Sequence, residues 1–264
     1  MATHHPVLGA ALPELGWVPA PSYLMRRDRI LRIMRALSPG ELLEIGCGAG
    51  ALLDDLSRMG YACQAMETSP AARALAEVML RDRAGIQVRA APAEEWNGRF
   101  DYVLAFEVLE HIEDDRGALA TWASWLKPRG HLVMSVPAHQ RRWTASDVWA
   151  GHYRRYEQAQ LISLLEASGF QIHRTECYGF PLSNMMSPLR GWLHQRAMRR
   201  ERTPAEDKAG NTQRSGTERT VESRFYPLEA SFVGTALLKL NFAIQDLFVG
   251  TEMGTGFLVL AQKS

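Results

Sequence analysis

The chain has 264 residues, of which 46% are hydrophobic and 22% are charged, so it can bury a full core and disorder is not expected. Thirty Lys and Arg residues against 29 Asp and Glu residues give a net charge of +1, which provides no global attraction to nucleic acid. Three cysteines without metal-ligand spacing, the lack of a leader-like segment and the lack of a long apolar run predict a cytoplasmic protein without a transmembrane segment.

Apolar runs alternate with stretches of helical periodicity after residues 1–21, which we expect to form an N-terminal extension. The expected strands cover 42–45, 61–66, 86–90, 101–106, 131–136 and 170–177, and the expected helices cover 23–37, 51–59, 70–83, 115–126 and 157–168. Residues 128–130 (Pro-Arg-Gly) are expected to break the chain before a strand. This alternation predicts an α/β fold with parallel strands between helices.

Residues 179–250 depart from the alternation and form an insertion of about seventy residues, longer than an ordinary loop. We expect a core over 22–178, a substrate or lid insertion in the same domain, and the final strand within 251–264. The polar segment 207–216 predicts a mobile loop. Apolar residues at helical spacing over 232–249 predict a helix that packs on the core, with a homodimer face or a membrane-surface contact as alternatives.

The segment 42–50 (LLEIGCGAG) takes an apolar strand directly into a glycine-rich turn. Glycines at 46, 48 and 50 remove Cβ atoms where backbone approaches a ligand, and a helix that begins near Ala51 points unpaired N–H groups at the same place. Dinucleotide-binding turns space their glycines differently and seat a pyrophosphate, which Glu44 would repel. Glu44 instead suits a cationic group such as the α-ammonium of S-adenosylmethionine.

Two later segments also place acidic residues at the ends of expected strands. Glu67 ends the strand 61–66, about twenty residues after the loop, where a carboxylate can accept hydrogen bonds from both ribose hydroxyls. The segment 100–111 (FDYVLAFEVLEH) supplies a buried strand followed by two carboxylates and a histidine. Together, the three segments resemble the class I S-adenosylmethionine-dependent methyltransferases of the methyltransferase type 11 group.

The resemblance covers roughly 22–178 and the last strand, 256–261. It implies a seven-stranded, mostly parallel Rossmann-like sheet flanked by helices, with an antiparallel last strand and a helical or loop insertion before it. Pro92 stands where the group commonly has an aspartate for the adenine amino group, so adenine recognition falls to the backbone near Ala93 or to Glu94. The cofactor-binding residues expected for S-adenosyl-L-methionine are Glu44, Gly46, Cys47, Gly48, Gly50, Glu67, Thr68, Ala93, Glu94 and Glu107.

Transfer of a sulfonium methyl group to a hydroxyl or ammonium acceptor requires removal of a proton. The candidate catalytic bases are His111, His139 and His152, which lie at or beyond the ends of the fourth and fifth expected strands. A hydrogen-bonded scaffold role is the alternative for each of them.

Glu107, Glu110 and His111 place two carboxylates and an imidazole within five residues, a set that a hard divalent cation would accept. The resemblance extends to small-RNA 2′-O-methyltransferases and ubiquinone-pathway O-methyltransferases, which are thought to hold a magnesium- or zinc-like ion at this motif, and His139 is a further ligand candidate. In the metal-free alternative, Glu107 lies by the methionine end of the donor and the other two brace the following helix.

The segment 139–156 is rich in arginine, tryptophan and tyrosine, which bind anions and stack on rings or cations. Its expected substrate-binding residues are Trp143, Tyr153, Arg154 and Arg155. The alternative is a structural loop whose arginines pair with acidic residues such as Asp147 and Glu157. We therefore expect methyl transfer to O or N of a small molecule, acidic or phosphorylated acceptors included; the alternatives are a metal-dependent RNA 2′-O-methyltransferase and a non-catalytic S-adenosylmethionine-binding module.

Overall fold

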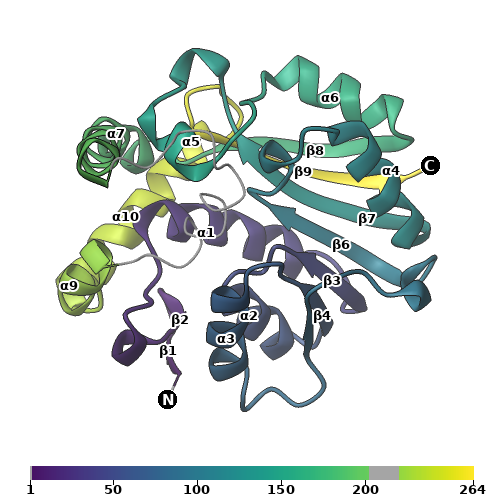
Figure 1. Ribbon diagram of the computed structural model, residues 1–264, viewed down its shortest axis with the longest axis horizontal. Helices are drawn as coiled ribbons and strands as arrows, with labels where there is room; N and C mark the ends of the chain where they lie inside the picture. Colours follow the sequence, from purple (N-terminus) through teal and green to yellow (C-terminus); the bar gives the residue numbers. More distant parts are fainter. Residues whose placement is uncertain (1, 202–219) are drawn as a thin grey trace.

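A seven-stranded sheet crosses the molecule in the order β5-β4-β3-β6-β7-β9-β8 (Figure 1). The computed structural model describes residues 2–201 and 220–264. The strands of the sheet are β3 (Glu41–Ile45), β4 (Ala62–Met66), β5 (Gln87–Arg89), β6 (Phe100–Phe106), β7 (Leu126–Pro137), β8 (Phe170–Tyr178) and β9 (Gly256–Lys263). The pairs among β3 to β7 are parallel, whereas β9 lies antiparallel between β7 and β8.

Helices cover both faces of the sheet. They are α1 (Pro21–Arg35), α2 (Ala51–Arg58), α3 (Pro70–Met79), α4 (Asp115–Trp125), α5 (Ala145–Ala150), α6 (Gln158–Ala167), α7 (Leu182–Glu201), α9 (Thr220–Glu229) and α10 (Phe232–Phe248). A small two-stranded sheet, β1 (Thr3–His5) with β2 (Gly9–Ala11), precedes them.

Alternating side chains of the strands build two separate cores, because successive residues of a strand point to opposite faces. Leu42 of β3 belongs to the core that α1, α2 and α3 cover, whereas Leu43 and Ile45 belong to the core that α4 and α6 cover. Glu44, two residues after Leu42, therefore shares the face of α1 and α2.

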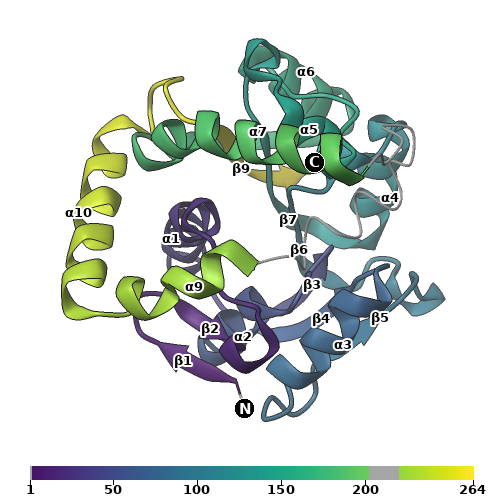
Figure 2. The same ribbon diagram turned by 60° about the vertical axis from the view of Figure 1, so that its left-hand side comes forward.

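The insertion is largely helical, and Figure 2 shows α7, α9 and α10 framing α1. Leu238 and Phe242 of α10 pack with Leu24 and Met25. Polar ties reinforce this apolar contact: the Gln245 amide donates to the Met25 carbonyl at 3.0 Å and accepts from the Gly179 N–H at 2.7 Å. The insertion is thus anchored to the core through both kinds of contact.

The structure confirms the predicted fold, including the antiparallel last strand and the insertion before it. One boundary was wrong: β7 begins at Leu126, so residues 128–130 lie within the strand, and Arg129 adopts a left-handed φ of 61° where the pairing with β6 shifts register. The loop predicted for 207–216 lies outside the described residues. Among the helices that are described, none is both long and apolar enough to cross a bilayer.

Candidate functional site

Four neighbouring strands end at one edge of the sheet, and each is followed by residues that the sequence singled out. In spatial order these strands are β4, β3, β6 and β7, which run parallel to one another. Glu67 follows β4, the glycine turn follows β3, Glu107 follows β6 and His139 follows β7. Open α/β sheets bind their ligands at this edge.

All three glycines of the turn have left-handed backbones, with φ of 68° at Gly46, 56° at Gly48 and 77° at Gly50. A Cβ at Gly46 would lie 2.7 Å from Cγ2 of Val108, so packing alone excludes a side chain there. A Cβ at Gly48 would meet no atom of residues 2–201 or 220–264 within 4 Å. Gly48 therefore borders open space, as the backbone beside a ligand must.

Glu67 joins this turn to the start of α3. Its carboxylate accepts the Gly48 N–H at 2.9 Å and the Ser69 N–H at 2.8 Å. The Arg73 guanidinium donates to the carbonyls of Glu67 and Thr68. Because each carboxylate oxygen can accept two hydrogen bonds, Glu67 retains acceptor capacity for a ribose.

Glu44 has a strongly perturbed carboxyl group. Its side chain is buried, and Oε2 finds no hydrogen-bond partner among the described residues. Burial, with smaller repulsions from Glu67 and Asp55, raises the pKa of Glu44 to about 8, against an opposing attraction from Arg26. A buried carboxylate without a partner costs free energy, so this position favours a cationic donor.

Two residues of α1 that the sequence analysis missed lie in the same region. Tyr23 Oη and Arg26 Nε are buried without hydrogen-bond partners among the described residues. The Arg26 guanidinium lies 5.9 Å from the centroid of the Tyr23 ring and 3.6 Å from a carboxylate oxygen of Glu107. Glu44 and Arg26 thus offer an acidic and a basic side chain, which fits the two charged ends of an amino acid.

Glu107 is held by three elements. Its backbone has a φ of 57°, which is strained for a residue with a side chain, and Oε1 accepts from the Ser135 hydroxyl at 2.9 Å and the Tyr178 hydroxyl at 2.8 Å. Burial, and then the charge of Glu107, raises the pKa of Tyr178, which keeps that hydroxyl a donor. Strained residues of this kind cluster at functional sites.

The remaining expected cofactor residues differ in environment. Ala93 precedes a short 3-10 helix and its carbonyl accepts the Trp96 N–H at 3.1 Å, while Glu94 is exposed. Cys47 is buried, and burial followed by the charge of Glu44 raises the pKa of its thiol well above the usual range. The thiol therefore stays protonated and unreactive.

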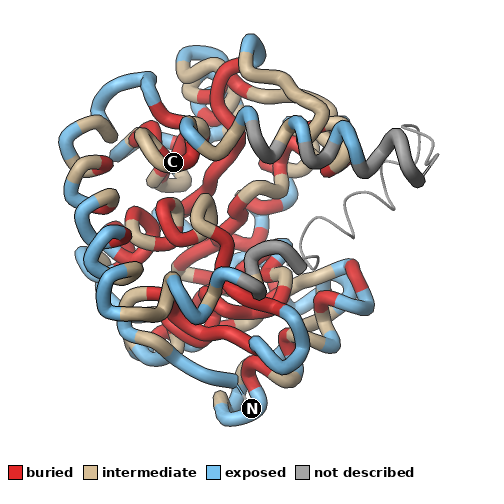
Figure 3. Tube along the Cα trace, turned by 90° about the vertical axis from the view of Figure 1, so that its left-hand side faces the viewer, coloured by how far each residue is buried: buried red, intermediate tan, exposed pale blue. Residues whose placement is uncertain are grey.

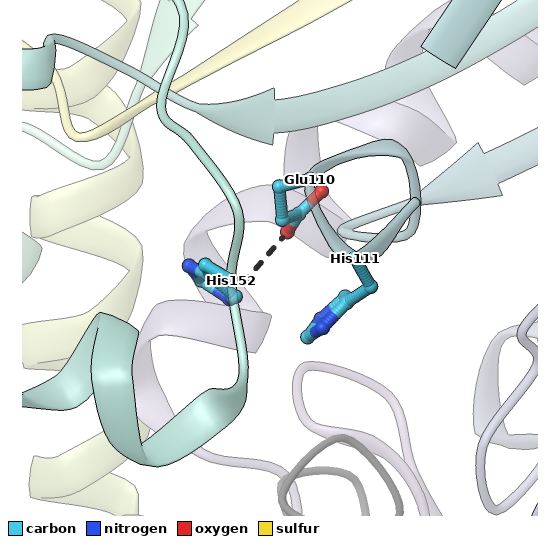
Figure 4. Close-up of side chains that lie close together, drawn as sticks. All are labelled: Glu110, His111 and His152. Atoms are coloured by element: carbon cyan, nitrogen blue, oxygen red, sulfur yellow. Dashed lines mark ion pairs between the residues drawn. The ribbon is translucent and has the colours of Figure 1, made fainter. Parts of the chain in front are cut away.

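A second cluster lies beyond β6, where Glu110 and His111 meet His152 from the loop after α5 (Figure 4). One ligand atom from each of these three residues lies within 4.8 Å of the others. Both carboxylate oxygens of Glu110 are fully buried without a hydrogen bond among the described residues. Burial, followed by repulsion from Glu107, raises the pKa of Glu110 well above its usual range. Glu107 itself is not a member of this cluster.

The two histidines of this cluster have different roles. Burial and then repulsion from His152 lower the pKa of His111 to about 3, although a hydrogen bond to the Gly151 backbone acts in the opposite direction. His111 is therefore neutral at pH 7. Nδ1 of His152 lies 3.0 Å from Oδ1 of Asp147, and its Nε2 lies 3.8 Å from Oε1 of Glu110. An Nδ1–H that donates to Asp147 leaves Nε2 with a lone pair for a proton or a cation.

Asp147 is fixed from several sides. Its oxygens accept from Nε of Arg155 at 2.7 Å and Nη2 at 3.0 Å, which forms a two-point ion pair. Burial alone would raise the pKa of Asp147, but hydrogen bonds from His152 and Arg155 lower it to about 2. Asp147 is thus a charged anchor for the ring of His152.

The expected substrate-binding arginines both have internal partners. Arg155 binds Asp147, as the structural alternative anticipated, and Arg154 donates to Oδ2 of Asp115 and to the Glu113 carbonyl, each at 2.7 Å. Trp143 and Tyr153 are partly exposed beside them. The arrangement favours a structural role for both arginines.

Both ring nitrogens of His139 have partners within the protein. Nδ1 lies 3.0 Å from Oε2 of Glu157, and Nε2 lies 2.8 Å from the Glu252 carbonyl. Both ring nitrogens therefore lie within hydrogen-bond distance of protein oxygens, which hold the ring in place. This geometry favours a scaffold role for His139 and leaves His152 as the better-placed base.

Comparisons with known proteins agree with the fold. A family model described as a methyltransferase domain matches residues 22–175. A ubiquinone biosynthesis O-methyltransferase of Bradyrhizobium sp. (strain ORS 278) is 37% identical over 114 residues, which cover 41% of this chain and 44% of that relative. The matched part therefore spans less than half the length of this relative.

Two solved structures share the fold. An S-adenosylmethionine-dependent methyltransferase from Mesorhizobium loti is similar over 92% of this chain and 98% of its own, with a TM-score of 0.55 at 16% identity. Phosphoethanolamine N-methyltransferase 2 of Haemonchus contortus, in complex with S-adenosyl-L-methionine, is similar over 90% of this chain and 52% of its own, with a TM-score of 0.54 at 17% identity. Because the family model covers more than half of the chain, the chain belongs to the methyltransferase-domain family, within the class I S-adenosylmethionine-dependent methyltransferases.

Proposed function

We propose that this protein transfers the methyl group of S-adenosyl-L-methionine to an oxygen or nitrogen of a small molecule, with oxygen favoured by the name of the Bradyrhizobium relative. The observation that carries this proposal is the buried Oε2 of Glu44, which has no hydrogen-bond partner in the described part of the chain, at the same end of β3 as the open backbone of Gly48. A ligand with an ammonium group next to a nucleoside satisfies both features.

The residues present fit this donor. Glu44 would bind the α-ammonium, and Arg26 would face the α-carboxylate from α1. Glu67 would accept hydrogen bonds from the ribose hydroxyls. The turn would lie against the nucleoside through Gly46, Cys47, Gly48 and Gly50. The residues that border the donor would be Thr68, Ala93, Glu94 and Glu107. The bound donor supplies an electrophilic methyl group.

His152 is the proposed base for a hydroxyl or ammonium acceptor. Asp147 fixes its ring, and its side chain is 13% exposed, so a substrate proton can reach it. His111 packs edge-on against it, with ring centroids 4.7 Å apart. Trp143 and Tyr153 would border the acceptor beside this base.

A metal-assisted form of the same reaction is the second candidate, and the Glu110 cluster is the observation that favours it. The imidazoles of His111 and His152 and the buried carboxylate of Glu110, which has no hydrogen-bond partner among the described residues, form a suitable ligand set for zinc or magnesium. Asp147 would act behind His152 as the outer carboxylate common at metal-bound histidines. When bound, such an ion would lower the pKa of an acceptor hydroxyl.

The other acceptor class is the ribose of an RNA end. That function would require salt-dependent RNA affinity, whereas the net charge of +1 gives RNA no general attraction. A non-catalytic donor-binding module would bind the donor and methylate nothing.

We predict that Gly48→Val abolishes donor binding, because the branched side chain would occupy the open space beside the turn. Gly85→Val is the matched control: Gly85 also has a left-handed backbone and open space, but it precedes β5 at the opposite edge of the sheet. Calorimetric titration with S-adenosylhomocysteine measures both. Equal donor affinity in the two variants would contradict the assignment of the turn.

We predict that donor binding at pH 7 releases up to one proton from Glu44, because a carboxyl with a pKa of about 8 is mostly protonated until an ammonium group binds it. Calorimetry in buffers of different ionisation enthalpy measures this release. Glu44→Gln should bind the donor about tenfold or more weakly, as expected for roughly 1.5–3 kcal/mol, and should release no proton from this position. Identical proton release by both proteins would rule out Glu44.

Methyl transfer itself is tested with methyl-deuterated S-adenosylmethionine and a small-molecule extract of the native host. The wild-type protein and Gly85→Val should produce the same labelled small molecule, identified by its mass shift, and Gly48→Val should produce none. Label that appears only on RNA would support the nucleic-acid acceptor, and label on no molecule would support the non-catalytic module.

For the metal, we predict that chelation suppresses turnover, that zinc, magnesium or manganese restores it, and that Glu110→Gln weakens manganese binding at least tenfold. Glu157→Gln serves as the control, because Glu157 belongs to a separate group of possible ligands with His139. Manganese binding by calorimetry is independent of activity. Full turnover by metal-free protein would reject the metal candidate.

A further inference from the structure

Helix α10 has an inner side that joins polar ties to the packing of Leu238 and Phe242, and an outer side with several exposed apolar residues. Gln245 is buried against the backbone of Met25 and Gly179, and Asp246 forms ion pairs with Arg29 and Arg32 of α1. Phe232 and Leu247, in contrast, are 88% and 78% exposed. An exposed apolar helix face of this kind marks an interaction site.

The outward residues follow a spacing of four, three, four and three positions. They are Val233, Leu237, Leu240, Ile244 and Leu247, of which Ile244 is partly buried and the other four are exposed. This is the spacing at which a helix packs along a partner helix, with the seam facing the partner throughout. Phe225 and Leu228 of helix α9, which contacts α10, are also exposed, and Figure 3 views the side of the molecule on which these helices lie. We call the surface of these seven residues and Phe232 the α9–α10 face.

Two other occupants fit this face less well. The chain segment 202–219 contains no Leu, Ile, Val, Met or aromatic residue that could cover it. A membrane surface would favour a helix rich in Lys and Arg, whereas α10 carries one Lys and one Asp, and the net charge of the chain is +1. A near-neutral chain with a charge-poor apolar face is suited to self-association.

We propose that the α9–α10 face is the interface of a homodimer, occupied by the same face of a second copy of this chain. Such an interface is self-complementary about a twofold axis. Its large apolar side chains, most of them more than half exposed, each offer on the order of 100 Å². Two faces would together bury on the order of 1,000 Å², the size at which specific association begins.

The geometry of the seam identifies its centre. Leu240 is the middle residue of the five at helical-partner spacing, so a twofold axis at this point brings the two copies of Leu240 together. The inner side of α10 is tied to Gly179, and the neighbouring Tyr178 hydroxyl donates to Glu107. The interface would thus support one wall of the proposed pocket, although dimerisation does not depend on methyl transfer.

Analytical ultracentrifugation of the full chain over a range of concentrations tests the proposal. We expect the wild-type protein to sediment at twice its mass of 29.6 kDa and Leu240→Lys to raise the dissociation constant at least tenfold. Leu15→Lys is the matched control, because Leu15 is 55% exposed, against 56% for Leu240, and lies before α1. Circular dichroism confirms that both variants fold.

A covalent test follows from the twofold axis. Leu240→Cys should form a disulfide-linked dimer under mild oxidation, whereas Leu15→Cys should not, and the three native cysteines are buried. A wild-type protein that remains a monomer, or a Leu240→Lys dimer as tight as wild type, would overturn the proposal. A monomer that binds phosphatidylglycerol vesicles and loses that binding in Leu240→Lys would assign the face to a membrane instead.

Discussion

The proposed donor site depends on one constraint: Glu44, at the end of β3, is buried and its Oε2 has no hydrogen-bond partner among the described residues. The alternation of β3 places Glu44 on the face that α1 and α2 cover, so its side chain leaves water and interacts electrostatically with Tyr23 and Arg26. Its ionisation opposes folding increasingly as the pH rises from the unfolded pKa of about 4.3 toward the folded value of about 8. A bound ammonium group offsets the free-energy penalty of ionising Glu44. The site therefore selects a cationic ligand.

The carboxylates near the strand ends divide into two classes by their partners. Glu67, Glu107 and Asp147 accept hydrogen bonds from the protein and fix the turn, the strand ends and the ring of His152. Glu44 and Glu110 have raised pKa values and unsatisfied buried oxygens. Since native proteins rarely leave buried polar groups unsatisfied, these two positions are where added chemistry is expected, a cationic donor at one and a proton or metal ion at the other.

Local sequence signals predicted the sheet, because alternating apolar strands and helices follow from the periodicity of the side chains. The same signals brought the proposed donor residues to the ends of neighbouring strands, because the glycine turn and Glu67 lie at fixed distances from those strands. Tyr23 and Arg26 escaped prediction because they reach Glu44 and Glu107 only after α1 folds onto the sheet. Contacts between residues that are distant in sequence also determine the partners of the side chains in segment 139–156. Arginines that look like anion receptors in sequence have Asp115 and Asp147 as partners in the fold, and His152 replaces Glu107 beside Glu110.

A crystal structure of the protein with S-adenosylhomocysteine tests the central claim most directly, because it locates the ammonium group. The account predicts an oxygen of Glu44 within about 3 Å of that nitrogen, a charge-assisted hydrogen-bond distance, and Glu67 at the ribose hydroxyls. A ligand bound elsewhere, or bound at the turn with Glu44 still unpartnered, would contradict it.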